Sequence, residues 1–156
     1  MIKQHIDLGK YLKMVKLLET SISNSNFEPQ LLLGINRGGL IPSVFLSHAL
    51  SIPMDTISIK TLDTCQLLPE QNLYVADYIL EKLALGVRTI VVEDIVDTGA
   101  TLNTLEILLK EKGINSDNIK HAALIARYNH GATKLDYYVK MIKNDNWLVF
   151  PYEKLD

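Results

Sequence analysis

The sequence predicts an α/β fold in which helices cover both faces of a mainly parallel sheet. Apolar runs of strand length alternate along the chain with segments whose apolar residues recur at helical spacing. The strand candidates are apolar throughout instead of alternating with polar residues, which is typical of strands buried on both faces. The chain has 156 residues, of which 47% are hydrophobic. That size and composition indicate one domain, residues 1–156, with a single well-covered core.

The first half of the chain is expected to form a helix and then a strand, a helix and a strand. Asp7 suits the N-cap of the opening helix. The apolar residues that then share one helical face are Leu8, Tyr11, Leu12, Val15, Leu18 and Ile22. The run at 31–35 predicts a buried strand, 40–50 a helix whose first turn tolerates Pro42, and 54–60 a second strand.

The second half continues the alternation, with glycines that suit the ends of two helices. In chain order we expect a helix at 69–86, a strand at 87–94, a helix at 102–113, and strands at 119–127 and 136–142. In open parallel sheets, ligands bind beyond the carboxyl ends of the strands. We therefore expect the functional site at that edge.

Composition and charge argue against several classes of function. Lys and Arg total 16 against 18 Asp and Glu, a formal net charge of −2, without the cationic excess that nucleic-acid binding usually needs. Cys65 is the only cysteine, so the chain can form neither an internal disulfide nor a thiolate zinc cage. No apolar run approaches the roughly 18–20 residues that cross a bilayer. We expect a cytoplasmic protein that binds neither nucleic acid nor membrane.

Residues 91–102, VVEDIVDTGATL, carry the most specific chemical pattern. An apolar strand ends in two acids, Glu93 and Asp94, and a third acid, Asp97, precedes a Thr-Gly-Ala-Thr run. Gly99 lets backbone N–H groups approach a ligand, and the start of the next helix adds N–H donors and the positive end of its dipole. These features predict a phosphate cradle. Because acids beside a bare phosphate would repel it, the pair also indicates a sugar and a cation.

This segment resembles the signature of the type I phosphoribosyltransferase family, which is a hydrophobic strand, two acids, two spacers, and then Asp, Thr, Gly and Thr. The resemblance implies that Glu93 and Asp94 hold the ribose 2- and 3-hydroxyls, with Asp94 near Mg²⁺. It also implies that the 5-phosphate is bound by Asp97, Thr98, Gly99, Ala100 and Thr101. In purine-using members the matching Asp faces N7 of the base, so Asp97 is the implied catalytic residue. Simple N-capping is the alternative role for Asp97.

A second loop, GINRGGLIP at 34–42, places Arg37 between a strand and a glycine pair. Backbone amides and a guanidinium can together face a polyanion there. The loop resembles the pyrophosphate loop of 6-oxopurine phosphoribosyltransferases, particularly of the short bacterial xanthine-guanine type, and this implies that Arg37 and Gly38 contact pyrophosphate. Taken alone, Asn-Arg-Gly-Gly is also an ordinary turn composition.

The base site is implied by three positions near the end of the chain. Trp147, the only tryptophan, could stack on a planar base or anchor the C-terminal strand to the core. In the xanthine-guanine type, the residue after a similarly placed Trp reads the base through its backbone, which implies that role for Leu148. Arg127 stands where the family has a Lys that donates to the 6-oxygen of the purine, and Lys134 is a second candidate. Arg has a longer, planar donor group, so this departure leaves the base identity open.

The resemblance implies a purine (6-oxopurine) phosphoribosyltransferase that uses phosphoribosyl pyrophosphate and Mg²⁺ and forms a homodimer or homotetramer. It also implies a small hood built from terminal segments, and a mobile loop at 60–71, in which no basic residue matches the one that usually reaches the pyrophosphate. Two alternatives stay open. The base could be orotate, uracil or adenine, or the chain could be a regulator of the same fold that binds phosphoribosyl pyrophosphate or a nucleotide without catalysis.

Overall fold

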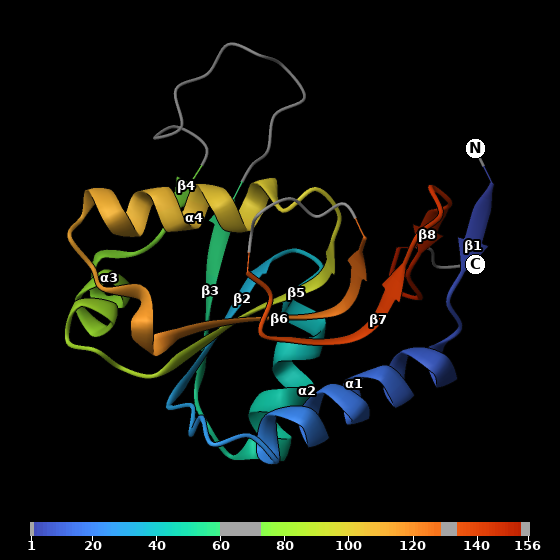
Figure 1. Ribbon diagram of the computed structural model, residues 1–156. Helices are drawn as coiled ribbons and strands as arrows, with labels where there is room; N and C mark the ends of the chain where they lie inside the picture. The colour runs from blue at the N-terminus through green and yellow to red at the C-terminus, as the bar shows by residue number, and fades with distance from the viewer. Residues whose placement is uncertain (1, 60–72, 129–133, 154–156) are drawn as a thin grey trace, which may run out of the picture.

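The protein is built as a six-stranded sheet between two layers of helices (Figure 1). The computed structural model describes residues 2–59, 73–128 and 134–153. The strand order is β4-β3-β2-β5-β6-β7, and among the strand pairs formed by these residues only β3–β4, at one edge, is antiparallel. The strands are β2 (Leu31–Asn36), β3 (Met54–Ile59), β4 (Leu73–Tyr74), β5 (Thr89–Val96), β6 (Ile119–Arg127) and β7 (Tyr137–Ile142). The predicted fold class, a mainly parallel sheet flanked by helices, is confirmed.

Each face of the sheet has its own core and its own pair of helices (Figure 1). Helices α1 (Leu8–Ser23) and α2 (Leu40–Leu50) cover one face, and α3 (Asp77–Ala84) and α4 (Ala100–Glu111) cover the other. Leu32, Ile90 and Val92 point to the first face, while Leu33 and Val91 point to the second. Burial on both sides explains why these strands are apolar throughout.

The opening helix confirms the predicted cap and most of the predicted face. The Asp7 carboxylate accepts a 2.8 Å hydrogen bond from the Lys10 N–H, which satisfies one of the donors at the helix start. The buried side chains of α1 are Tyr11, Val15, Leu18 and Ile22. Leu8 and Leu12, expected on the same face, are exposed instead.

Several predicted boundaries differ from the structure, and the helix expected at 102–113 runs from Ala100 to Glu111. The helix expected at 69–86 begins only at Asp77, because Leu73 and Tyr74 pair with Ile59 and Ser58 as β4. Residues 69–72 lie outside the described part of the chain. The strand expected at 87–94 runs from Thr89 to Val96, since its last residues continue the parallel pairing with β6.

The two ends of the described chain form a second, small sheet. Strand β1 (Lys3–His5) pairs in parallel with β8 (Trp147–Val149), and the two lie together beyond the β7 edge of the main sheet (Figure 1). This arrangement confirms the expected hood of terminal segments. A short 3₁₀ turn, η2 (Ser116–Asn118), leads into β6. Within the described ranges, no helix combines the length and apolar character that crossing a membrane requires.

Candidate functional site

The predicted pyrophosphate loop and the predicted acids meet at the carboxyl ends of neighbouring strands, here called the carboxyl edge. Strands β2 and β5 pair in parallel, so the loop after Asn36 lies beside the acids of β5. A Cβ atom built on Gly38 would lie well under 3.0 Å from the Asp94 carboxylate, and one on Gly39 would meet the Val92 carbonyl. The glycine pair is therefore required by the close approach of the two segments.

Arg37 is exposed at the start of this loop, and the structure shows no ion pair from its side chain to any described residue. The loop itself is braced by a 2.6 Å hydrogen bond from the Asn36 amide to Ser58 Oγ and by the Gly39 N–H, which donates to the Ile35 carbonyl. A cationic side chain on a braced loop is available to an anionic ligand.

Glu93 and Asp94 lie within β5 and form a poorly solvated acidic pair. Burial, followed by the charge of Asp94, raises the pKa of Glu93 to about 8. Burial also raises the pKa of Asp94, although hydrogen bonds from Tyr152 and the Ile95 N–H oppose that shift. Among described residues, no Lys or Arg forms an ion pair with either acid. A protonated Glu93 can both donate to and accept from ligand hydroxyls.

The residues behind Asp94 were missed by the sequence reasoning. The Tyr152 hydroxyl donates to Asp94 Oδ2, and the Tyr152 ring stacks on Phe150 at 5.5 Å and meets Tyr11 edge-on at 5.8 Å. The Tyr11 hydroxyl is buried without a hydrogen-bond partner in the described structure, and burial together with the Asp94 charge raises its pKa. No local pattern relates Tyr11, Asp94 and Tyr152, because the three lie in the first helix, the middle strand and the C-terminal tail.

The predicted phosphate cradle lies where β5 turns into α4. Gly99 takes a left-handed conformation at φ 79°, the region that glycine adopts without steric cost, and it occupies the N-cap position of α4. No side chain caps the helix from that position, so the positive end of the helix dipole faces outward. Thr98 Oγ1 accepts a 3.3 Å bond from the Ala100 N–H, Thr98 and Ala100 are exposed, and Thr101 is partly buried. This geometry can receive a phosphate.

Arg127, at the end of β6, is held by protein groups. Its Nε lies 2.7 Å from Asp97 Oδ1, its Nη2 donates to the Asn146 carbonyl at 2.8 Å, and its Nη1 donates to the Asn144 carbonyl. A cavity of about 100 Å³ beside this contact is lined by Asp97, Thr98 and Arg127. The structure thus brings the third acid of the motif and the turn before β8 together.

Trp147 and Leu148 begin β8 directly after that turn. Trp147 is 53% exposed, whereas Leu148 is buried in the core of the α1 face. The residue before Trp147, Asn146, accepts a hydrogen bond from Arg127, and this contact links Trp147 to the rest of the site. Lys134, the second candidate for a base contact, lies away from these residues and pairs with Asp136. The expected mobile loop at 60–71 lies outside the described residues.

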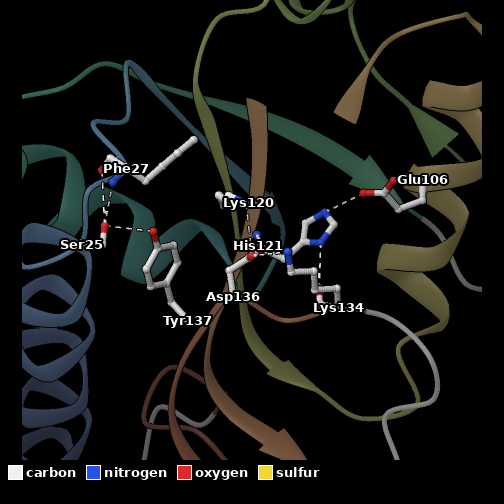
Figure 2. Close-up of polar contacts among 8 residues, drawn as sticks. All are labelled: Ser25, Phe27, Glu106, Lys120, His121, Lys134, Asp136 and Tyr137. Carbon is white, nitrogen blue, oxygen red and sulfur yellow. Dashed lines mark hydrogen bonds and ion pairs between the residues drawn. The ribbon is translucent and has the colours of Figure 1, made fainter. Parts of the chain in front are cut away.

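A second polar group, the His121 cluster, lies at the opposite end of the strands and consists of Glu106, Lys120, His121, Lys134 and Asp136 (Figure 2). Asp136 accepts from the His121 N–H at 2.9 Å and lies within 3.6 Å of the ammonium groups of Lys120 and Lys134. The His121 ring contacts the Lys134 carbonyl at 3.1 Å through Nδ1 and approaches Glu106 to 3.3 Å through Nε2, though without hydrogen-bond geometry. Its charges are largely compensated internally.

Comparison with known proteins finds relatives of a single family. Residues 7–155 match the family described as Phosphoribosyl transferase domain. A xanthine-guanine phosphoribosyltransferase of Cereibacter sphaeroides is 29% identical over 122 residues, which cover 78% of this chain and 67% of that protein.

Solved structures show the same fold. A purine phosphoribosyltransferase from Pyrococcus horikoshii superposes with a TM-score of 0.73 and 28% identity, over 100% of this chain and 97% of that one. The xanthine-guanine-hypoxanthine phosphoribosyltransferase of Helicobacter pylori gives a TM-score of 0.71 at 22% identity, over 97% and 94% of the two chains. At that identity the likeness concerns the fold alone.

Proposed function

The chain belongs to the phosphoribosyltransferase family, and from that premise we propose that it transfers a phosphoribosyl group to a 6-oxopurine base. The substrates would be phosphoribosyl pyrophosphate and xanthine, guanine or hypoxanthine, and the products a nucleoside 5'-monophosphate and pyrophosphate, as in purine salvage. The observation that carries the proposal is the close approach of Gly38, in the loop after Arg37, to the half-buried carboxylate of Asp94, which lies next to Glu93. The purine-using relatives support the choice of base.

Each part of the carboxyl edge suits one part of the sugar phosphate. Arg37 and the backbone at Gly38 are suited to the pyrophosphate, because they offer a guanidinium and close backbone approach. The segment from Thr98 to Thr101 at the start of α4 is suited to the 5-phosphate. Glu93 and Asp94 are suited to the ribose hydroxyls, which can donate to a carboxylate.

The acidic pair also fits Mg²⁺. The carboxylates are half-buried, their pKa values are raised, and a bound cation would favour their charged forms. Within residues 2–59, 73–128 and 134–153, no three metal-binding side chains gather. Mg²⁺ commonly takes one or two protein carboxylates and completes its shell with water and substrate oxygens, so Asp94 would hold it together with the ligand. The ion would neutralise negative charge on the leaving pyrophosphate.

In the proposed reaction a base nitrogen attacks C1 of the sugar as the bond from C1 to pyrophosphate breaks. Positive charge then develops on the ring, and the Asp97 carboxylate is suited to stabilise it and to hold the proton at N7 of the base. The Trp147 face is available for stacking, and the Leu148 backbone could read the edge of the base. Alignment of the two reactants at the site would lower the entropic part of the barrier.

The direct test is base-dependent release of pyrophosphate in the presence of Mg²⁺, with xanthine, guanine, hypoxanthine, adenine, orotate and uracil supplied separately. Asp97→Asn should lower kcat by about 10²–10³, the usual effect of losing one electrostatic stabiliser. Asp117→Asn is the matched control, because Asp117 lies in η2 and contacts Asn115 away from these residues. The kcat of this control should equal that of the natural protein.

The outcomes separate the alternatives. Release with orotate, uracil or adenine alone would replace the 6-oxopurine assignment. Tight binding of phosphoribosyl pyrophosphate without release by any base would instead indicate the non-catalytic regulator.

We also propose a homodimer or homotetramer in the cytoplasm. The apolar side chains of Leu8, Ile41, Val44 and Phe45 are exposed next to one another on α1 and α2, which supports self-association. A single cysteine suits a reducing compartment. Sedimentation velocity of the natural chain and of Phe45→Glu would test the assembly, and only the natural chain should form the oligomer.

A further inference from the structure

Arg127 joins two segments that are distant in sequence and that both belong to the proposed site. One segment is the turn from β5 to α4, reached through Asp97, and the other is the turn at 144–146, reached through two backbone carbonyls. The Arg127 side chain is only 14% exposed, whereas the Asp97 side chain is 63% exposed. Asp97 is thus a largely solvated carboxylate that a largely buried cation holds in place.

The three guanidinium nitrogens of Arg127 each have a protein partner. Burying a cation costs free energy unless it is paired and hydrogen-bonded, and here one carboxylate and two carbonyls provide an acceptor for each guanidinium nitrogen. The planar fork also fixes the relative positions of those acceptors. Asn146 immediately precedes Trp147, so the same contact holds the backbone from which the indole projects.

We propose that Arg127 is a positioning residue that sets Asp97 and the segment of Trp147 and Leu148 at a fixed separation, and that it does so in place of donating to the base. The inference rests on the proposed function, since Asp97 and Trp147 have catalytic and stacking roles only there. Its structural content, that Arg127 holds the turn at 144–146, stands on the contacts alone.

Replacing Arg127 by Lys separates this role from a direct contact with the base. Lysine is the residue that the family resemblance places here as the donor to the purine 6-oxygen. If Arg127 contacted the base, Lys would preserve or improve the use of 6-oxopurines. If Arg127 positions its neighbours, a single ammonium on a flexible stem cannot hold one carboxylate and two carbonyls in one plane.

The kinetic experiment compares Arg127→Lys with Arg88→Lys. Arg88 is a matched control, because its Nε donates to the Glu28 carbonyl at 2.6 Å away from the site. For Arg127→Lys we expect kcat/KM for the base to fall about 100-fold, the typical effect of a 1 Å misplacement. KM for phosphoribosyl pyrophosphate should rise by a smaller factor than this, because Arg127 contacts the turn before α4 through Asp97 and does not contact the loop at Arg37. A merely structural role would lower the active fraction or the melting temperature without this separation of the two substrates.

A second readout needs no activity. Trp147 is the only tryptophan, so fluorescence anisotropy of the protein without substrates reports on the segment that Arg127 holds. Arg127→Lys and Arg127→Ala should both increase indole mobility, while Arg88→Lys should not. Free guanidinium should restore part of the anisotropy and of the activity in Arg127→Ala. If that variant fails to fold, the Lys variant still decides the question.

Two results would overturn the inference. The first is an Arg127→Lys protein that keeps its natural activity with 6-oxopurines, and the second is Trp147 anisotropy that is unchanged in both Arg127 variants. If the natural protein releases no pyrophosphate with any base, the proposed function fails. In that case the anisotropy alone decides whether Arg127 holds the turn.

Discussion

The carboxyl edge and the His121 cluster are both rich in charged residues, but they treat their acids differently. In the His121 cluster, Asp136 accepts from a backbone N–H and lies near two lysine ammonium groups (Figure 2). At the carboxyl edge, Glu93 and Asp94 are side by side with no cationic partner among the described residues, and burial raises both pKa values. The negative charge of Asp136 is offset by neighbouring protein groups, whereas the charges of Glu93 and Asp94 have no cationic partner among the described residues.

This difference distinguishes a structural polar group from one prepared for a ligand. An acid whose cost of burial is offset by its neighbours stabilises the fold. An acid pair whose charges are not offset destabilises the folded protein, and it persists where a cation or hydroxyl groups offset that cost on binding. Substitutions at the carboxyl edge should therefore affect activity first, and those in the His121 cluster should affect stability first.

Gly38→Ala should give the largest effect on activity. The added methyl group would overlap the Asp94 carboxylate and push apart the two segments that carry the proposed pyrophosphate and ribose contacts. We expect kcat/KM to fall by about 100-fold or more. Gly9→Ala in the first turn of α1 is the control, since its methyl group would meet only the Asp7 carboxylate at 3.3 Å. Equal activity of the two variants would contradict the close approach.

Glu93→Gln should change how stability depends on pH. With its pKa raised to about 8, Glu93 stays protonated in the folded protein while the unfolded chain releases the proton from about pH 4.5 upward. The folded protein therefore loses stability as pH rises from about 4.5 to about 8. Glutamine does not titrate, so across this interval the free energy of unfolding of the variant should rise relative to that of the natural protein, by an amount on the order of a few kcal/mol. Urea unfolding at pH 5 and pH 8 measures it, and a pH-independent difference would show that Glu93 is not buried as an acid.

Asp136→Ala should reduce stability without a specific loss of catalysis. Its removal leaves the His121 N–H, in a residue that is 4% exposed, without its carboxylate acceptor. We expect the free energy of unfolding to fall by about 1–3 kcal/mol while kcat/KM of the folded protein stays the same. Glu106→Gln is the comparison within the cluster and should cost under about 0.5 kcal/mol, because the contact of Glu106 with His121 lacks hydrogen-bond geometry. If Asp136→Ala lost activity while its free energy of unfolding stayed unchanged, the His121 cluster would not be the structural group that we infer.

Much of the fold could be predicted because hydrophobic periodicity is a local property. The helix at 40–50 and the strand at 119–127 have the predicted bounds, and the parallel, two-sided burial of the sheet follows from continuous apolar runs such as 31–35. The helix predicted from 69 was wrong at Leu73 and Tyr74, since pairing with β3 overrides the local preference there. Strand pairing joins residues that a short sequence window does not contain.

The sequence by itself determined the residue types of the candidate site: two adjacent acids, a third acid before a Thr-Gly pair, and an arginine before a glycine pair, each close in the chain to the residues proposed to act with it. The tertiary structure alone decided which groups support them. Tyr152 reaches Asp94 from the C-terminal tail, and Arg127 connects Asp97 to the turn before Trp147. Contacts of this kind depend on which strands and termini pack together, and packing is a property of the whole folded chain.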